Sequence, residues 1–396
     1  MKVLVYHPGK QHIYKLVEGL EKNNITYHFY TGLYYTCLNK TSQKYLKSLN
    51  KKRFSTRINP KHVSCINLYQ ELFFSLWART NIFMRSRNRL LFNKQLSFQK
   101  KLLKIIPHDV SHVITFHTNA FYLYEKLREY KTNKPHLILE AAQPHPLWIQ
   151  KLYEKYSHLE KYFPLNYTED MITAYANEFD LAENIVVPST FLKNTLMEFG
   201  VEEHKISLIF YGSDYNNVYP RENRENKKLN IAYCGLVSPS KGFHFLKEVA
   251  RQTKRVAEFH IFGRPIARRL LNKLPSNIHL YGFVSHKDLF KYYSFMDIFY
   301  FPTLYDASGL ALLEGMSFGL VPIASPYSIA PDIIENGKNG YIVEPEEIEK
   351  TVEIINNLYL NRYKLFEMSK KIMKDTKKFT WSHYQKGYIQ LLEGEH

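Results

Sequence analysis

The sequence predicts an α/β protein in which two doubly wound, Rossmann-like domains face a central cleft. Short apolar runs alternate with helical patterns along the chain, which is typical of parallel sheets covered by helices. A chain of 396 residues is too long to fold around one hydrophobic core of ordinary size, and it fits two domains of about 200 residues each. A polar stretch at residues 211–228, YGSDYNNVYPRENRENKK, separates two series of such runs. We therefore expect domains at residues 1–212 and 213–377.

Each series of apolar runs supplies the strands of one sheet. In the first half we expect strands at KVLVYH (2–7), TYHFYT (26–31), HVITFH (112–117), HLILEA (136–141) and NIVVPS (184–189). In the second half we expect them at LNIAYCG (229–235), AEFHIFG (257–263), NIHLYGF (277–283), DIFYFPT (297–303), LVPIAS (320–325) and GYIVEP (340–345). The last segment, residues 378–396, reads as a separate helix that contains Trp381.

The composition is that of a folded globular protein, with 45% hydrophobic and 15% aromatic residues. No apolar run is long enough for a signal peptide or a membrane span. The three cysteines have no metal-like spacing, and we expect them to be reduced thiols. These features favour a cytoplasmic protein.

Nearly all of the net charge of +17 lies in one segment, residues 40–104. This segment has 16 Lys and Arg and a single acid, Glu71, which gives 16 − 1 = +15, whereas the rest of the chain has 38 − 36 = +2. Aromatic and aliphatic residues are interleaved with the charges. An anionic membrane surface would suit this pattern, because each nearby Lys or Arg contributes about 1 kcal/mol. The alternatives are a solvated helical face and, since no nucleic-acid motif accompanies the charge, less favourably a nucleic acid.

Polar residues and glycines gather where the expected strands end. They are Gly9 to His12, His117, Gly235, Gly263 with Arg264, and Asp306. Ligands of doubly wound domains bind beyond the carboxyl ends of the strands, so five such placements predict a cleft.

The stretch DASGLALLEGMSFGLVPIAS, residues 306–325, places Glu314 in an otherwise apolar helix. A buried carboxylate requires a partner, because its desolvation costs several kcal/mol. Gly309 permits a tight turn, and the N–H groups of residues 309–311, Leu310 among them, suit a phosphate. Glu314 would then accept hydrogen bonds from two ribose hydroxyls, and Asp306 from a second sugar. The structural alternative is that Asp306 caps the helix and Glu314 pairs with a buried Lys or Arg.

Residues 301–325 resemble the signature of retaining glycosyltransferases of family 4 (glycosyl transferases group 1), which have the GT-B fold. Other matching stretches are IAYCGLVSPSKGFHFL (231–246), HIFGRPI (260–266), IHLYGFVSHKDLFKYYSFMDIFYFPT (278–303) and VVPSTFLKNTLMEFGVEEHKISLIFYGSD (186–214). The match is strong in the second half and poor over residues 30–110. The resemblance implies that the terminal helix crosses back to the N-terminal domain.

The resemblance also assigns roles to single residues of the second half. Glu314 matches the glutamate that binds ribose, and Lys241 matches the lysine that neutralises the donor diphosphate. Asp306 stands where the family usually has Glu, and Leu236 where it usually has Arg. We expect Arg264, at the next strand end, to supply the missing charge.

Three further matches concern the base and the first domain. Val284 and its neighbours match the segment whose backbone contacts the base, and we expect Gly9 to line the cleft from the other side. His145, in QPHP, lies near the place of a family histidine close to the donor sugar, and His117 ends its own strand. Each histidine is either catalytic or an ordinary buried histidine.

The reaction that the resemblance implies is glycosyl transfer, with retention of configuration, from a nucleotide-sugar (UDP- or GDP-sugar) to an acceptor hydroxyl. The acceptor is expected to be a glycan or a lipid-linked glycan at the inner face of the cell membrane. The chain has no Asp-x-Asp motif, so we expect no metal and no cofactor. The alternatives are a nucleotide-sugar epimerase of the same fold and an inactive membrane- or nucleic-acid-binding relative, for which Asp306 and Leu236 argue.

Overall fold

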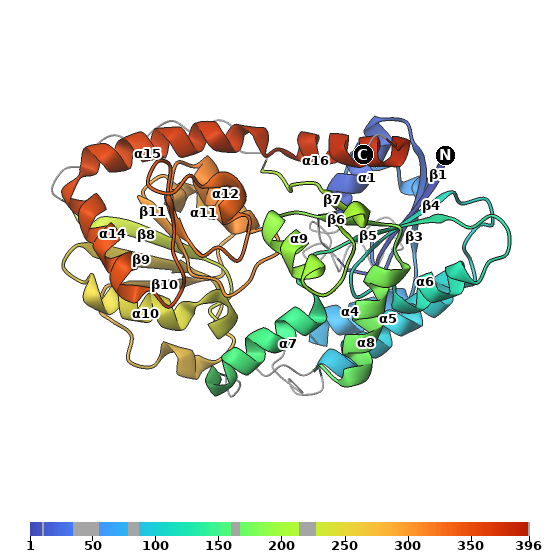
Figure 1. The fold of residues 1–396 in the computed structure, drawn as a ribbon, viewed down its shortest axis with the longest axis horizontal. Coiled ribbons are helices and arrows are strands. Elements are labelled where there is room, and N and C mark those ends of the chain that lie inside the picture. Colours follow the sequence, from blue (N-terminus) through green and yellow to red (C-terminus); the bar gives the residue numbers. More distant parts are fainter. Residues whose placement is uncertain (10–11, 35–54, 78–86, 160–166, 214–226, 395–396) are drawn as a thin grey trace, which may run out of the picture.

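The computed structural model of the chain describes residues 1–9, 12–34, 55–77, 87–159, 167–213 and 227–394. The strands form two parallel sheets, each covered by helices on both faces (Figure 1). The predicted α/β class with two doubly wound units is therefore confirmed. The boundary between residues 212 and 213 stays a prediction, because residues 214–226 lie outside the described ranges.

The N-terminal sheet has the strand order β3-β2-β1-β4-β5-β6-β7, and every neighbouring pair is parallel. Its strands are β1 (Lys2–His7), β2 (Thr26–Thr31), β3 (Val63–Cys65), β4 (His112–Phe116), β5 (His136–Glu140), β6 (Asn184–Val187) and β7 (Ile206–Leu208). The order reverses between β1 and β4, and at such a switch point doubly wound sheets leave a crevice for ligands.

The C-terminal sheet has the order β10-β9-β8-β11-β12-β13, again parallel throughout. Its strands are β8 (Leu229–Cys234), β9 (Ala257–Phe262), β10 (Ile278–Gly282), β11 (Ile298–Phe301), β12 (Val321–Ala324) and β13 (Tyr341–Ile342). Here the switch point lies between β8 and β11. The loops after these two strands therefore start side by side.

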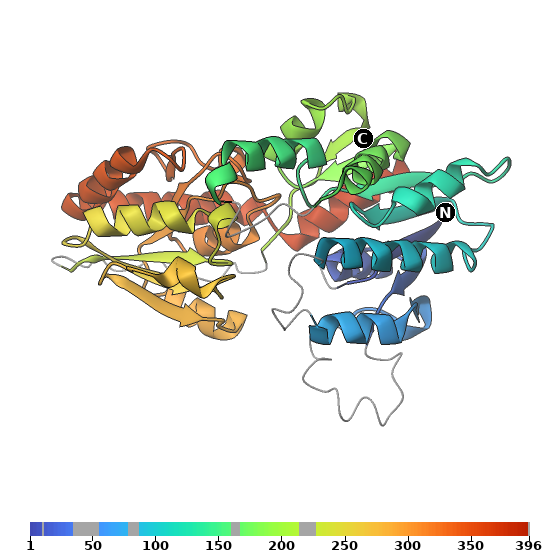
Figure 2. The ribbon, with the colours of Figure 1, turned by 90° about the horizontal axis from the view of Figure 1, so that it is seen from below.

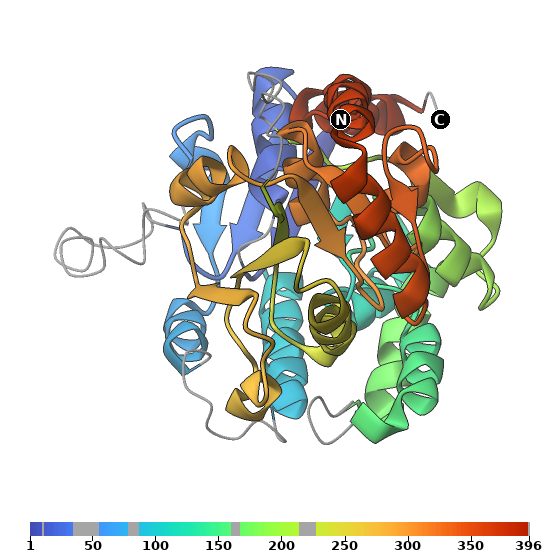
Figure 3. The ribbon, with the colours of Figure 1, turned by 90° about the vertical axis from the view of Figure 1, so that its left-hand side faces the viewer.

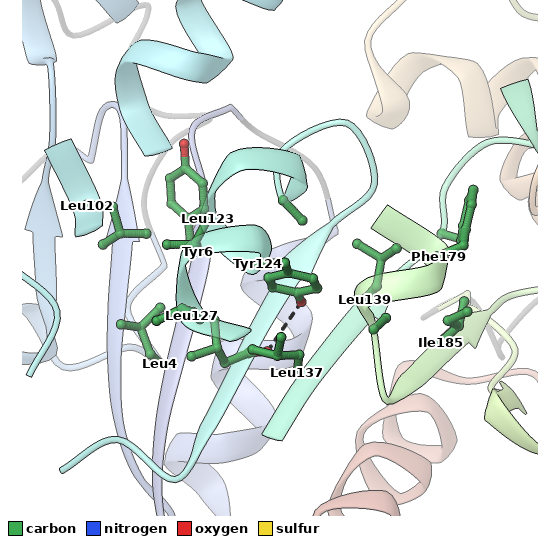
Figure 4. Close-up of a cluster of buried hydrophobic side chains, with 14 of the residues drawn as sticks. Leu4, Tyr6, Leu102, Leu123, Tyr124, Leu127, Leu137, Leu139, Phe179 and Ile185 are labelled. Carbon is green, nitrogen blue, oxygen red and sulfur yellow. Dashed lines mark hydrogen bonds between the residues drawn. The ribbon is translucent and has the colours of Figure 1, made fainter. Parts of the chain in front are cut away.

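Helices α5, α6, α8 and α9 cover one face of the N-terminal sheet. Their bounds are α5 (Arg87–Leu103), α6 (Phe121–Arg128), α8 (Glu169–Leu181) and α9 (Thr190–Met197). Figure 4 shows Leu4, Leu137 and Leu139 of the sheet packed against Leu123 and Leu127 of α6. Alternate strand residues face this cluster because the side chains of a strand point to opposite faces.

The other face of the N-terminal sheet is covered by the first and last helices of the chain, α1 (Ile13–Lys22) and α16 (Trp381–Glu393). Figure 1 shows α16 running on from α15 (Arg362–Asp375) along the top of the molecule, from the C-terminal unit to the N-terminal one. Tyr384 and Tyr388 of α16 are completely buried in this core. The terminal helix therefore crosses back, as the resemblance implied.

The C-terminal sheet is covered on one face by α10 and α14 and on the other by α11, α12 and α13 (Figure 3). Their bounds are α10 (Phe243–Gln252), α11 (His286–Tyr293), α12 (Leu310–Ser317), α13 (Ala330–Ile333) and α14 (Ile348–Leu360). Ile231 and Tyr233 of β8 face the first cluster and Ala232 the second.

Two helices lie at the borders of the N-terminal unit. Helix α4 (Leu68–Trp77) follows the edge strand β3, and α7 (Pro146–Lys155) reaches toward the C-terminal unit (Figure 2). Within the described ranges, no helix has the length and apolar character needed to span a bilayer.

Two sequence expectations were wrong. Strands β3 and β7 were not predicted, because each has only three residues and carries no clear alternation. Cys65 is disulfide-bonded, whereas Cys234 is free, so the expectation of reduced thiols fails for Cys65.

Candidate active site

The loop after β8 carries Lys241 and is fixed against the end of β11. Ser238 caps a short 3₁₀ turn, Pro239–Lys241, and its hydroxyl accepts from the Lys241 N–H at 3.3 Å. Gly242 has φ = +70°, and a Cβ there would lie 1.8 Å from the Pro302 carbonyl oxygen. Only glycine allows this close approach, which brings the loop onto the segment that follows β11.

Lys241 and Asp306 form an ion pair in this loop cluster. The Lys241 ammonium lies 2.7 Å from Asp306 Oδ2 and donates to the Tyr305 carbonyl at 3.0 Å. Asp306 Oδ1 accepts from the N–H groups of Gly309 at 2.8 Å and Ser308 at 3.3 Å. Burial raises the pKa of Asp306, but the ammonium and the two amides outweigh it, so the pKa lies below its ordinary value. Both carboxylate oxygens are thus engaged in holding the loop.

Helix α12 begins directly after this turn. Gly309 adopts φ = +57° as its N-cap, and its N–H, expected to face a phosphate, donates to Asp306 instead. Leu310 is partly buried and packs against the core of the N-terminal unit. The helix start therefore lies where the two units meet.

Glu314 lies one turn into α12 and is mostly buried, with 15% of its side chain exposed. Burial raises the pKa of this carboxyl to about 7. His286, the first residue of α11, places its Nδ1 3.6 Å from Glu314 Oε1. No Lys or Arg among the described residues pairs with Glu314, so the ion pair of the structural alternative is not found there, whereas Asp306 does accept from the N–H groups at the start of the helix, as that alternative expected. A buried carboxyl with a raised pKa beside an exposed histidine marks a candidate functional site.

The ends of β8, β9 and β10 carry Leu236, Arg264 and Val284. Leu236 is 55% exposed, and Arg264 is exposed with its guanidinium carbon 5.3 Å from the ring centre of Phe283. Val284 is partly buried against the core beside α11 and α12. The structure thus brings Arg264 to the predicted edge of the sheet, in contact with an aromatic ring.

The two candidate histidines of the N-terminal unit are buried and neutral. His117 Nε2 lies 3.9 Å from Glu178 Oε2, and burial lowers the pKa of His117 to about 3. His145 caps α7 by accepting from the Leu147 N–H at 3.3 Å, and burial lowers its pKa to about 4. Its ring also stacks on Phe199, 4.9 Å between centres. His145 therefore has a structural role in this structure, and a catalytic role for either histidine stays a prediction.

Gly9 and the two histidines follow the neighbouring strands β1, β4 and β5, so they share one edge of the N-terminal sheet. Gly9 donates its N–H to His7 Nδ1 at 3.1 Å. This edge is the one next to the switch point between β1 and β4.

Direct contacts hold the two units together around the site. The Ser189 hydroxyl, at the start of α9, donates to the Ala307 carbonyl at 2.6 Å. The Thr190 N–H donates to Asp332 Oδ2 at 3.1 Å, and Lys155 pairs with Glu346 at 2.8 Å.

A small apolar pocket of about 20 Å³ lies between α7 and the Lys241 loop, lined in part by Tyr153, Tyr156, Leu304 and Tyr305. The Lys241 loop and the turn before α12 therefore border the interface between the two units.

Sequence reasoning missed three residues near the site, Phe283, His286 and Asp332. Phe283 and His286 flank Val284 in a stretch already matched to the family, so their proximity to Val284 was the available signal. Asp332 had no signal, because its partner Thr190 is 142 residues away.

A fourth missed residue, Glu140, is completely buried at the end of β5. It accepts from the hydroxyls of Tyr211 at 2.6 Å and Tyr384 at 2.9 Å, and from Tyr388 and His12. These donors hold its pKa below the ordinary value although burial acts in the opposite direction. A glutamate that ends an apolar strand was the sequence signal.

The family model for glycosyl transferases group 1 matches residues 216–379. An uncharacterized 41.2 kDa protein of the cps region of Klebsiella pneumoniae is 25% identical over 186 residues, 44% of this chain and 51% of that protein. Sulfoquinovosyl transferase SQD2 of Arabidopsis thaliana is 26% identical over 217 residues, 50% of this chain and 42% of that protein. The match therefore covers less than two thirds of the length of either relative.

Solved structures resemble the whole chain. Sucrose-phosphate synthase from Thermosynechococcus elongatus has a TM-score of 0.73 at 14% identity, with 100% of this chain and 98% of that chain covered. HepE of Anabaena, solved with UDP and glucose, has a TM-score of 0.67 at 13% identity, with full coverage of both chains. The lipopolysaccharide outer core galactosyltransferase WaaB has a TM-score of 0.62 at 18% identity, also with full coverage of both. These likenesses show a GT-B fold.

Proposed function

Residues 216–379 belong to the glycosyl transferases group 1 family, and from that premise we propose that the chain moves a sugar from a nucleotide-sugar to an acceptor hydroxyl. The observation that carries the proposal is the cluster of Lys241, Asp306 and Glu314 around the start of α12. It combines a cation for the leaving diphosphate with a buried carboxyl for ribose hydroxyls, at the switch point of the sheet.

In the proposed reaction the bond between the anomeric carbon and the diphosphate oxygen breaks, and a bond from that carbon to the acceptor oxygen forms. The Lys241 ammonium and the N–H groups of Leu310 and Ala311, which follow the Gly309 N–H that Asp306 engages, stabilise the charge of the departing nucleoside diphosphate. The acceptor proton passes to a leaving phosphate oxygen, so the protein needs no separate base. Asp306 holds Lys241 in place through their ion pair.

Retention of configuration is part of the proposal and rests on the resemblance to family 4. We also propose that neither a metal nor a cofactor is required, because the sequence has no Asp-x-Asp motif. UDP- and GDP-sugars are the donors we propose, because a structural neighbour was solved with UDP and glucose. A glycan or lipid-linked glycan is the proposed acceptor, since another neighbour is a lipopolysaccharide galactosyltransferase.

We propose that the basic segment, residues 40–104, binds the protein to the anionic inner face of the cell membrane. Eight of its 16 basic residues lie outside the described ranges, and Lys94 is buried against Glu71 at 2.5 Å. On α4, Tyr69 and Phe73 lie four residues apart and are 86% and 63% exposed, as an inserting aromatic edge would be.

The test of the activity is a donor screen. The purified protein is incubated with UDP- and GDP-sugars and with glycan acceptors, and products are read by mass spectrometry. Transfer to an acceptor, or slow release of nucleoside diphosphate by hydrolysis, supports the proposal. A sugar that changes configuration while still attached to the nucleotide would indicate an epimerase. If calorimetry detects no binding of any nucleoside diphosphate, the cleft is inactive.

The membrane proposal has its own test, sedimentation with vesicles. Binding to vesicles with anionic lipid, weakened by salt, is expected, because the Debye length falls from about 10 Å at 0.1 M to about 3 Å at 1 M. Phe73→Ser should reduce this binding, whereas Tyr363→Ser, on α15 and 71% exposed, should not. Equal sedimentation with neutral and anionic vesicles would contradict the electrostatic part.

A further inference from the structure

Helix α7 joins the two units on the side of the molecule away from α15 and α16 (Figures 1 and 2). It starts in the N-terminal unit at Pro146, and its end at Lys155 lies against the C-terminal unit. Leu152 and Tyr156 are four residues apart, and Tyr153 follows Leu152, so these side chains share one face near the end of the helix. All three border the small apolar pocket between the units, so this face is turned toward the C-terminal unit.

One carboxylate of the C-terminal unit fixes the end of α7. Glu346 lies just before α14, and its Oε1 is 2.8 Å from the Lys155 ammonium. The Tyr156 hydroxyl donates to the same oxygen. Burial alone would raise the pKa of Glu346, but the hydrogen bonds from Lys155 and Tyr156 bring it below its ordinary value. The end of α7 is therefore held against the C-terminal unit by bonds that involve no residue of the Lys241 loop.

Apolar packing continues this contact toward the proposed site. The pocket of about 20 Å³ has room for about one water molecule, so it is a seam between packed side chains and not a ligand site. From the C-terminal unit, Ser240, Leu304 and Tyr305 line it, and the Leu304 N–H donates to the Ser240 carbonyl at 2.8 Å. Ser240 directly precedes Lys241, and Tyr305 directly precedes the aspartate of the ion pair. Helix α7 thus packs on both segments that carry this pair.

Tyr305 is the residue through which this packing reaches Lys241. Burial is the main cause that raises the pKa of the Tyr153 hydroxyl, and a side-chain hydrogen bond with Tyr305 adds to it. The ring centre of Trp148, also on α7, lies 6.4 Å from that of Tyr305. Tyr305 in turn contacts Lys241 twice, since its carbonyl accepts from the ammonium at 3.0 Å and its ring centre lies 5.7 Å from the ammonium nitrogen. One side chain therefore links the N-terminal unit to the cation proposed for the diphosphate.

The position of the Lys241 ammonium depends on these partners. A lysine side chain is flexible, and fixing it in one conformation costs rotamer entropy. The contacts that fix it here are the Asp306 carboxylate, the Tyr305 carbonyl and the Tyr305 ring. Two of the three belong to Tyr305, so a shift of Tyr305 moves the ammonium. When the two units part, Tyr305 loses its contacts with α7, and Lys241 is held less firmly.

We propose that Tyr153 is a positioning residue for Lys241, which acts through Tyr305 and holds the ammonium ready for the donor diphosphate while the two units are in contact. This inference rests on the proposed function. It assigns a residue of the N-terminal unit, outside the matched residues 216–379, to the support of the donor site. Separation of the units then loosens Lys241 as well as widening the cleft, so opening also weakens the hold on the nucleoside diphosphate.

The experiment follows the reactivity of Lys241 and the affinity for inorganic pyrophosphate. Lysines of the full chain are acetylated with limiting reagent, and their rates are read by mass spectrometry, with Lys247 of α10 as the internal reference. Tyr153→Phe removes the hydroxyl that reaches Tyr305, so Lys241 should react about threefold faster, and calorimetry should show pyrophosphate bound about fivefold more weakly. Tyr153→Ala should have a larger effect on both, because packing is lost as well.

Turnover gives a further readout that a merely structural contact would not move. Release of UDP from UDP-glucose should be about fivefold slower in Tyr153→Phe than in the unmodified protein. In the Lys241→Met background the same change should have no effect, because the ammonium that Tyr153 positions is absent. Equal effects in the two backgrounds would overturn the positioning role.

The matched control is Tyr156→Phe, the same change three residues later, which removes the hydroxyl that donates to Glu346. It should leave the reactivity of Lys241 and the pyrophosphate affinity unchanged. If it acted like Tyr153→Phe, α7 would merely hold the units together, and the inference would be overturned. No change in either quantity for Tyr153→Phe and Tyr153→Ala would also overturn it and leave the proposed function intact. If the unmodified protein binds neither pyrophosphate nor UDP, the proposed function fails, and the inference with it.

Discussion

The hydroxyl of Tyr388 donates a hydrogen bond to the carboxylate of Glu140, which lies 248 residues earlier in the chain. Tyr388 belongs to the last helix, α16, and Glu140 ends β5 in the N-terminal sheet. Both side chains are completely buried. Tyr384, one turn earlier on α16, donates to the same carboxylate at 2.9 Å. The last helix is thus attached to the first domain by polar bonds as well as by apolar packing.

Tyr388→Phe should lower the free energy of unfolding by about 1.5–3 kcal/mol, because a buried carboxylate loses one donor. Urea unfolding followed by circular dichroism measures this change. The control is Tyr363→Phe, on α15 and 71% exposed, which should change stability by less than about 0.5 kcal/mol. If Tyr388→Phe were as stable as the unmodified protein, the remaining donors to Glu140 would be sufficient without Tyr388.

Glu314 should make stability depend on pH. Its pKa is about 7 in the folded protein against an ordinary value of 4.5, so the folded state binds this proton more tightly than the unfolded chain. Its contribution is therefore favourable below about pH 4.5 and declines as the pH rises through 7. Relative to Glu314→Gln, the unmodified protein should lose about 3 kcal/mol between pH 4 and pH 8.

Unfolding midpoints at several pH values test this stability prediction. Glu353→Gln, an exposed glutamate on α14, should run parallel to the unmodified protein. If the free energies of unfolding of Glu314→Gln and the unmodified protein differed by the same amount at every pH, the pKa of Glu314 would not be raised in the folded protein.

The same titration should appear in donor binding, because ribose hydroxyls need the ionised carboxylate as acceptor. Affinity for UDP-glucose should rise between pH 6 and pH 8 and then level off. In Glu314→Gln it should be flat, and weaker at pH 8 by about 1.5–3 kcal/mol, the range for a hydrogen bond to a charged group. Calorimetry at three pH values measures both. A pH-independent affinity in the unmodified protein would assign Glu314 to structure.

Lys241 and Asp306 should not contribute independently to turnover, because their side chains are 2.7 Å apart. Lys241→Met should lower kcat/KM by about 10²–10³, as the loss of one electrostatic stabiliser does. It also leaves the Asp306 carboxylate unpaired beside the diphosphate. The double variant Lys241→Met, Asp306→Asn should therefore be more active than Lys241→Met alone.

Steady-state kinetics on the four members of this cycle give the coupling directly. Lys247→Met, on α10, is the control and should retain activity, since Lys247 donates to the Asn272 carbonyl at 2.6 Å, away from the Lys241 loop. Strict additivity would show that Asp306 faces the donor sugar and does not act through Lys241.

Local sequence patterns predicted the fold well, because parallel strands that are buried on both faces consist of short, continuous runs of apolar residues. They also singled out Asp306 and Glu314, since a carboxylate in an apolar helix is visible without a structure, whereas Lys241 was assigned only by the resemblance to the family. The pairing of Lys241 with Asp306 was not predicted. It spans 65 residues and depends on the close packing of Gly242 against Pro302.

Other features left no readable pattern. Strands β3 and β7 are short edge strands, each fixed by one neighbouring strand. Glu140 has tyrosine partners 71, 244 and 248 residues away, so no local window contains the site. Phe283 was expected to end a strand, but β10 ends at Gly282, beside a shift in register, and the Phe283 side chain is exposed.

The crossing of α16 restricts how this chain can be cut or recombined. A fragment that stops at residue 212 would lack Tyr384 and Tyr388, which fill the core of its own domain. It would also leave Glu140 without two of its donors. A chimera that exchanges the donor half with a relative must therefore be an internal replacement with two junctions, one near residue 213 and one near residue 377. Simple end-to-end fusion of two halves would instead pack a foreign last helix against the N-terminal domain. A chimera that keeps the N-terminal domain of this chain must therefore also keep its last helix, α16.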